Sequence, residues 1–157
     1  LIQIMKALEL KGLQARLDVY GDVSQSGRYI LENLKVPKNI NFKGYMVQDE
    51  MLKKLSKSDI FIFPTYMEGC ARAVMEAMVL GLPVITTKES GVPISSKQDG
   101  IIINNNTDIQ EWVKAIVFLN NKTHANKIGL KARELIINNY SNKNYVKKLK
   151  DIYTKNL

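Results

Sequence analysis

Hydrophobic and polar positions follow two different rhythms along this chain. In seven segments the apolar residues recur every three or four positions, the spacing of one helix face. Six of these segments are residues 1–10, 28–34, 49–56, 71–80, 122–138 and 142–155. The seventh ends at residue 119, and Thr107 or Asp108 can cap it. Five short runs between them favour strands, at residues 15–20, 40–44, 60–63, 84–87 and 101–103. Strands that alternate with helices predict a single-domain α/β fold with a doubly wound parallel sheet.

The clearest part of this pattern is a strand, a helix and a second strand in the middle of the chain. Residues 60–63 form a continuous run of β-branched and aromatic side chains, typical of a strand buried on both faces, and Pro64 ends it. The helix over residues 71–80 stops at Gly81, ahead of the second strand. Together they predict a βαβ unit whose helix N-terminus faces the carboxyl edge of the sheet, where ligands bind.

Two glutamates frame the start of this helix, Glu68 in the loop before it and Glu76 about two turns in. The first turn of a helix leaves N–H donors unpaired at the positive end of its dipole, which suits a diphosphate. Carboxylates on either side suit hydroxyl groups, a ribose and a sugar, so the layout is that of a nucleotide-sugar. Gly69 permits close backbone approach, and the small Cys70 and Ala71 leave room. The alternative is that both glutamates only stabilise the helix N-terminus.

The segment from Glu68 to Glu76, with Gly-Leu-Pro-Val-Ile at residues 81–85, resembles the E-x7-E region of retaining glycosyltransferases, particularly glycosyltransferase family 4. The resemblance covers nearly the whole chain. It implies that residues 1–157 form the Rossmann-like, C-terminal donor-binding domain of an enzyme of the two-domain GT-B class. On this view the first strand of the domain and the N-terminal acceptor domain are expected to lie outside the sequence.

The same resemblance assigns roles to individual residues. Glu68 would bind the hydroxyls of the donor sugar at the catalytic centre, next to Gly69, and Glu76 would hold the ribose. Four backbone amides would face the donor: those of Cys70 and Ala71 the sugar, and those of Arg72 and Ala73 the diphosphate. The Arg72 side chain could pair with phosphate or face solvent.

Three further loops match the family pattern. Gly21 follows the first predicted strand, where relatives carry a glycine-rich loop near the donor. Gly44 and Tyr45 follow the second strand, at the place of the base-contacting loop. Tyr45 could flank a base or could pack against the following helix. Residues 87–93 resemble a loop of G-G-x-P-E type that lies close to the donor.

The amino-acid composition limits the size of the fold and the kinds of ligand and partner molecule that the chain can bind. The chain has 157 residues, of which 45% are hydrophobic, enough for one core. One Cys and one His exclude an internal disulfide and a zinc cluster, and they fit a reducing, cytoplasmic compartment. The net charge is +8, but the lysines spread over several helices and no helix-turn-helix, RNA-recognition or zinc signature is present, which argues against nucleic acid. The charge favours anionic nucleotide-sugars and acidic lipid surfaces.

The last predicted helix is strongly basic. Its lysines are Lys143, Lys147, Lys148, Lys150 and Lys155. Such a run forms a solvated face, or it makes a weak contact with a membrane surface or a partner domain.

The resemblance implies an enzyme that moves a sugar from a nucleotide-diphosphate sugar to a glycan or lipid-linked acceptor with retention of anomeric configuration, in cell-surface polysaccharide or glycolipid synthesis. The helix end and basic side chains would stabilise the leaving diphosphate, with no metal or cofactor. The family's phosphate-clamping arginine and lysine and its acceptor site lie upstream, so we expect this chain alone to be inactive. An alternative of a different class is a non-catalytic nucleotide- or phosphate-binding Rossmann module that acts through partners.

Overall fold

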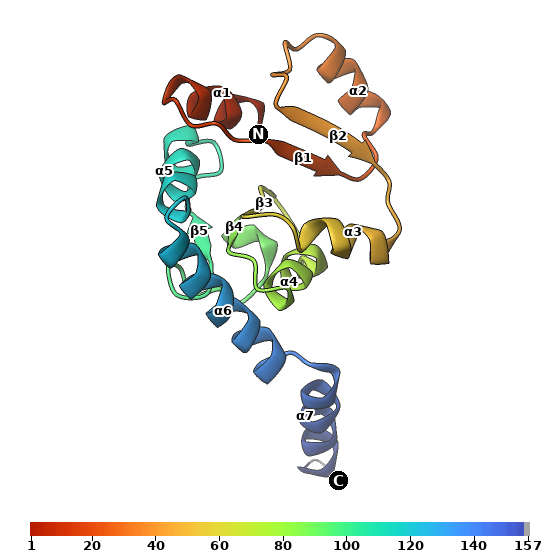
Figure 1. Ribbon diagram of the computed structural model, residues 1–157. Helices are drawn as coiled ribbons and strands as arrows, with labels where there is room; N and C mark the ends of the chain where they lie inside the picture. Colours follow the sequence, from red (N-terminus) through yellow and green to blue (C-terminus); the bar gives the residue numbers. More distant parts are fainter. Residues whose placement is uncertain (156–157) are drawn as a thin grey trace.

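Helices and strands alternate along the chain in the order that the polar pattern predicts (Figure 1). The computed structural model describes residues 1–155, without the side chains of Ser26, Ile30, Asn142, Tyr145, Lys148, Leu149 and Lys155. The strands are β1 (Leu17–Tyr20), β2 (Ile40–Gly44), β3 (Phe61–Phe63), β4 (Val84–Thr87) and β5 (Ile101–Ile103). The helices are α1 (Ile2–Leu10), α2 (Gln25–Glu32), α3 (Gln48–Leu55), α4 (Arg72–Val79), the 3-10 turn η1 (Lys88–Ser90), α5 (Ile109–Leu119), α6 (Lys122–Asn139) and α7 (Asn142–Lys155).

The strands form two pieces of parallel sheet. β1 pairs with β2 in one piece, and β3, β4 and β5 pair in that order in the other. Helices α2, α3 and α4 connect successive strands up to β4, and a loop containing η1 leads on to β5. The predicted α/β class with parallel strands is confirmed, with a break in the hydrogen bonding between β1 and β3.

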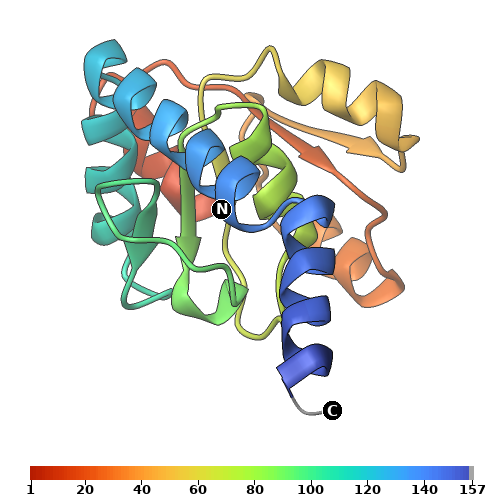
Figure 2. The ribbon, with the colours of Figure 1, turned by 90° about the horizontal axis from the view of Figure 1, so that it is seen from below.

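Two hydrophobic cores lie on opposite faces of the sheet, because neighbouring residues of a strand point to opposite sides. The first core joins α1, α5 and one side of the strands, with Ile85 and Trp112 fully buried. The second core joins α4 to the ends of α3 and α6 and to the other side, with Val84 and Met78 fully buried. The strands are therefore sandwiched between helices, which is the layered arrangement seen in Figure 2.

Local signals explain where the helices begin and end. Asp108, rather than Thr107, caps α5, because its carboxylate accepts the backbone N–H groups of the first turn. Gly12 ends α1 with a φ of 73°. α2 begins at Gln25, three residues before the predicted start, because the Ser24 hydroxyl accepts the N–H of Gly27 at 3.1 Å and supplies the first turn.

β3 is less covered than the sequence predicts. Ile60 and Ile62 pack against the first core, and Phe61 and Phe63 against the second, so both faces of the strand make contacts. All three residues of β3 nevertheless stay half-buried, whereas every residue of β4 is buried. The prediction of a strand buried on both faces is therefore wrong. The reason is its place in the sheet, since β3 has a paired strand only on the side of β4.

The last helix extends away from the sheet beyond the end of α6 (Figures 1 and 2). Lys143, Lys147 and Lys150 are exposed on it. Lys148 and Lys155, which the sequence groups with them, have side chains outside the described part of the chain. Across residues 1–155 we find no helix that combines the length and the apolar character needed to cross a bilayer.

Candidate active site

Buried hydroxyl groups hold the chain where it leaves β3. Thr86 and Thr87 of β4 donate their hydroxyl protons to the carbonyls of Phe63 (2.8 Å) and Thr65 (2.7 Å). The side-chain amide of Asn106 donates to the same Thr65 carbonyl at 3.1 Å. These contacts fix the direction of the loop that carries Glu68. Sequence reasoning missed them, although two adjacent threonines at the end of an otherwise apolar strand are a usable signal.

A carboxylate holds the Asn106 loop in turn. Glu111 on α5 accepts the backbone N–H groups of Asn104 and Asn105, each at 3.0 Å. Burial raises the pKa of this carboxyl group, but the hydrogen bonds from Asn104 and Asn105 lower it more, so its pKa lies below the ordinary value. The charged form of Glu111 is thus the form that fixes the loop.

The loop over residues 68–71 is joined to the turn after β4. Glu68 donates its N–H to the Glu89 carbonyl (2.9 Å), and Ala71 donates to the Ser90 carbonyl (2.8 Å). Gly91 has a φ of 67°, and a Cβ there would lie 2.3 Å from the Gly69 carbonyl oxygen. Only glycine fits this contact. The structure thus brings the predicted donor loop of residues 87–93 directly against residues 68–71.

The N-terminus of α4 opens from this pair of loops. Ala71 is its N-cap residue and makes no side-chain cap hydrogen bond. Within the described residues, the amides of Arg72 and Ala73 have no hydrogen-bond acceptor, whereas the Ala71 amide is occupied by Ser90. Glu68 and Cys70 are exposed beside this helix end. The first turn of α4 thus presents two free N–H donors beside an exposed carboxylate.

Glu76 is held by two side chains on the same carboxylate oxygen. Arg72 Nε lies 3.0 Å from its Oε1, and Gln48 Nε2 donates to the same atom at 2.7 Å. Gln48 is the first residue of α3, and sequence reasoning missed it because nothing in the local pattern marks it. Arg72 is largely exposed and pairs with Glu76, an arrangement that neither sequence alternative describes.

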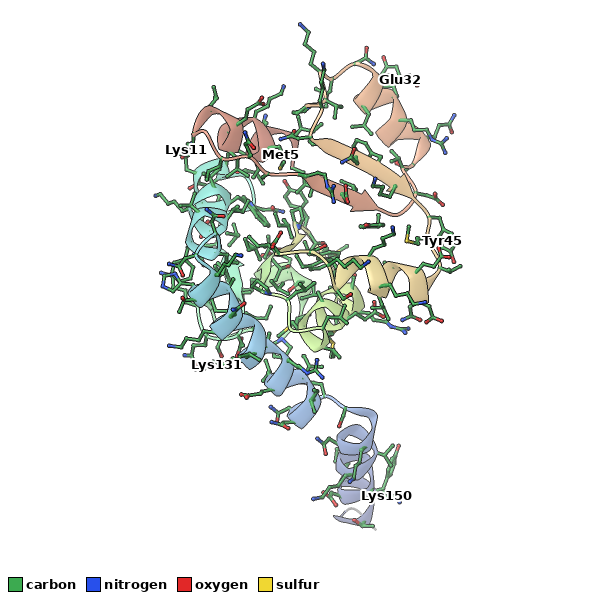
Figure 3. All side chains as sticks on the ribbon, viewed as in Figure 1. Met5, Lys11, Glu32, Tyr45, Lys131 and Lys150 are labelled. Atoms are coloured by element: carbon green, nitrogen blue, oxygen red, sulfur yellow. The ribbon has the colours of Figure 1, made fainter. Side chains whose placement is uncertain are left out.

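The remaining predicted residues lie at the ends of β1 and β2. Gly21 donates its N–H to the Gly44 carbonyl at 2.9 Å, and both residues have positive φ. Tyr45 is 74% exposed and lies at the turn into α3 (Figure 3), so its ring is not buried against that helix. Because Gln48 contacts Glu76, the turn that carries Tyr45 lies at the same edge of the sheet as α4.

The chemistry of this edge suits an anion flanked by hydroxyl groups. Free amides at a helix N-terminus bind phosphate oxygens, and carboxylates such as Glu68 and Glu76 accept hydrogen bonds from hydroxyls. Among the described residues no three His, Cys, Asp or Glu side chains gather closely enough to hold a metal ion.

Comparison with known proteins gives a consistent picture. The chain is 28% identical over 157 residues to the UDP-Gal:alpha-D-GlcNAc-diphosphoundecaprenol alpha-1,3-galactosyltransferase of Escherichia coli, covering 83% of this chain and 40% of that protein. A TarM variant from S. aureus, crystallised with UDP among its ligands, superposes with a TM-score of 0.80 and 25% identity over 97% of this chain and 31% of that one. Anabaena HepE, solved with UDP-glucose, shares the fold with a TM-score of 0.75 and 18% identity over 88% of this chain and 41% of its own.

The chain spans less than half the length of each of these three relatives. The family model described as glycosyl transferases group 1 matches residues 1–152, which is almost the whole sequence. The chain therefore belongs to the group 1 glycosyltransferases.

Proposed function

We propose that this chain is the C-terminal, donor-binding half of a retaining glycosyltransferase of family 4 type. The whole enzyme would transfer a sugar from a nucleotide-diphosphate sugar to a glycan or lipid-linked acceptor in cell-surface polysaccharide or glycolipid synthesis. The observation that carries the proposal is the N-terminus of α4, where the free amides of Arg72 and Ala73 lie between the exposed Glu68 and the positioned Glu76. The UDP and UDP-glucose present in related structures support a nucleotide donor.

The proposal gives each residue of the edge a role. The amides of Arg72 and Ala73 bind the diphosphate, and the Cys70 amide and Glu68 bind the sugar, beside the backbone of Gly69. The Ala71 amide reaches the sugar only if it exchanges its bond to Ser90. Glu76 accepts a hydroxyl of the ribose while Gln48 keeps its carboxylate in place. The turn formed by Gly44 and Tyr45, which Gly21 supports, contacts the base.

The proposed mechanism needs no metal ion or cofactor from this chain. As the bond to the sugar breaks, negative charge grows on the leaving diphosphate, and the positive end of α4 stabilises it. The Arg72 guanidinium can turn from Glu76 to a phosphate oxygen, because its side chain is largely exposed. The remaining phosphate-binding side chains lie upstream of α1 and the acceptor belongs to the other domain, so the isolated chain binds donor without turnover.

A calorimetric titration tests the proposal directly. Nucleoside diphosphates and the corresponding nucleotide-sugars are titrated into residues 1–157 in the presence of EDTA. We expect weak binding of both, because each charge-assisted contact from the upstream arginine and lysine is worth roughly 1.5–3 kcal/mol, or more than tenfold in affinity. Binding that requires a divalent cation would contradict the metal-free mechanism. Equal affinity for diphosphate and every nucleotide-sugar would instead favour the non-catalytic binding module.

We also propose that the protein works in the cytoplasm, with α7 resting weakly on the inner membrane surface. Exposed lysines lie on α7 beside the exposed apolar residues Val146 and Tyr153. A helix of this kind binds anionic headgroups through charge and inserts its apolar side chains shallowly.

Co-sedimentation with vesicles tests this contact. Replacing Lys143, Lys147 and Lys150 by glutamate should abolish binding to phosphatidylglycerol vesicles, since each lysine contributes about 1 kcal/mol near an anionic surface. Replacing Lys122, Lys127 and Lys131 of α6 by glutamate is a control with the same charge change; Figure 3 shows Lys131 and Lys150 on the two helices. Equal loss in both variants would mean that only net charge matters.

A further inference from the structure

The two carboxylate oxygens of Glu76 have different surroundings. Oε1 lies 3.0 Å from Arg72 Nε and accepts a second hydrogen bond from Gln48 Nε2 at 2.7 Å. Within the part of the chain that the structure describes, no group donates to Oε2, and this atom is not buried. Because a carboxylate accepts about two hydrogen bonds at each oxygen, Oε1 is saturated and Oε2 is open to a ligand.

The interaction that holds Arg72 against Glu76 is weak. Arg72 is the first residue of α4, and its side chain is 79% exposed. Exposed ion pairs four residues apart add little stability, and the order with the cation first is the less favourable one. A cation in the first turn also opposes the helix dipole, and α4 has no acidic residue there to offset it. The guanidinium can therefore leave Glu76 at low cost when an anion binds nearby.

A nucleoside diphosphate carries both groups that compete for this ion pair. Two neighbouring ribose hydroxyls need one acceptor at each oxygen of Glu76, so a donor on Oε1 has to leave before the second hydroxyl binds. A diphosphate on the free amides of Arg72 and Ala73 would lie beside the backbone that carries the guanidinium. It attracts this cation through charge-assisted hydrogen bonds, whereas the neutral amide of Gln48 gains less from it.

We propose that Arg72 couples the phosphate end of the nucleotide site to its ribose end, an inference that rests on the donor site proposed above. Without phosphate, the guanidinium occupies Glu76 Oε1 and competes with the ribose. When a diphosphate binds at the start of α4, the guanidinium moves to it and frees Oε1 for the second hydroxyl. Arg72 therefore makes the site selective for a nucleoside diphosphate over the bare nucleoside.

Titrations of uridine and UDP into residues 1–157 test this coupling, with affinities measured by ligand-observed magnetic resonance. UDP is the probe because it is present in a related structure. Arg72→Met should weaken UDP about tenfold or more, because a charge-assisted contact is lost. The same variant should strengthen uridine about twofold, because the weak ion pair no longer competes for Glu76. A purely structural role would shift both affinities in the same direction.

Arg16 supplies a matched control. Its side chain is 75% exposed and pairs with Asp18 at 3.4 Å, much as Arg72 pairs with Glu76. Arg16 directly precedes β1, so it lies at the amino edge of the sheet, opposite the edge that carries the start of α4. Arg16→Met makes the same change of charge and should leave the affinities for uridine and UDP unchanged.

The possible outcomes separate this coupling from the donor site itself. If Arg72→Met weakens UDP but does not strengthen uridine, the arginine binds phosphate without competing for Glu76, and the coupling is overturned. If neither affinity changes, the coupling is also overturned, and the donor site stands provided that Glu76→Ala still weakens UDP. If UDP does not bind the unchanged chain, the donor site and the coupling fail together.

Discussion

The two pieces of sheet differ in how their strands are buried. Every residue of β4 is buried, whereas all four residues of β1 are only half-buried. The sequences explain the difference, because β4 begins with two adjacent apolar residues and β1 alternates apolar residues with Asp18 and Tyr20. Asp18 accepts a hydrogen bond from Asn41 and pairs with Arg16 at 3.4 Å, so the polar face of β1 and β2 is held by side chains rather than by a core.

This contrast shows where the rigidity of the site comes from. The loop with Glu68 and the N-terminus of α4 belong to the three-stranded piece, and buried threonines fix them. The turn with Tyr45 belongs to the two-stranded piece and is tied to α4 by the hydrogen bond from Gln48 to Glu76. The phosphate and sugar ends of the site are thus built on a rigid support, and the base end is less constrained.

The largest effect on stability is expected from a glycine-to-alanine substitution, and we compare one such substitution beside each piece of sheet. A Cβ at Gly129 of α6 would lie 2.0 Å from the Gly81 carbonyl oxygen, a backbone atom, so Gly129→Ala should lower the free energy of unfolding by about 3 kcal/mol. In α2, a Cβ at Gly27 would meet only the side chains of Val23 and Ser24, and alanine favours a helix by about 1 kcal/mol. Gly27→Ala should therefore change stability little. Urea denaturation measures both, and equal losses would remove the contrast.

Glu76 joins the two pieces, and its removal should weaken the nucleotide end of the site. Glu76→Ala should reduce nucleoside diphosphate affinity by roughly 1.5–3 kcal/mol, because a charged acceptor is lost. Gln48→Ala should cause a smaller loss, since the carboxylate remains but is free to turn. Calorimetry checks affinity, and thermal melting is the control. A lower melting temperature in Glu76→Ala with unchanged diphosphate affinity would make this carboxylate structural.

Glu68 should contribute to the binding of the donor sugar and not to the binding of the diphosphate. Glu68→Ala should weaken a nucleotide-sugar by roughly 1.5–3 kcal/mol and leave the free diphosphate nearly unchanged. Glu89→Ala is the matched control, because it removes an exposed carboxylate from the turn that binds the Glu68 backbone. Parallel losses for diphosphate and nucleotide-sugar would argue against contact between Glu68 and the sugar.

The smallest predicted effect is a pH-dependent change in stability that arises from the loop around Asn106. The pKa of Glu111 is lowered from 4.5, so its charged form stabilises the folded chain above that pH, and this contribution is lost as the pH falls through the folded-state pKa. Glu111→Gln should cost at most about 1 kcal/mol at pH 7, because the group is only partly buried. The difference from the unchanged chain should shrink below pH 4.5. A constant difference from pH 7 to pH 3 would show that the charge is not involved.

The sequence predicts the elements well because their signals are local. Strand residues 40–44, 84–87 and 101–103 match β2, β4 and β5 at both ends. The start of α2 was misplaced because a serine cap outweighed the apolar spacing. The burial of β3 was misjudged because apolar residues indicate that a strand can be buried, but they do not indicate which strands pair with it.

Part of the candidate site also follows from local sequence signals, and the rest depends on the tertiary structure. The order of the βαβ unit and the positions of Glu68 and Glu76 around its helix follow from the sequence alone, since helix and strand periods involve residues only a few positions apart. Tertiary structure decided which amides are free, because Ser90 occupies that of Ala71. It also decided that Gln48 orients Glu76 and that Asn106 supports Thr65, across 28 and 41 positions. Contacts at that distance depend on how helices and loops pack on the sheet, and no local pattern records them.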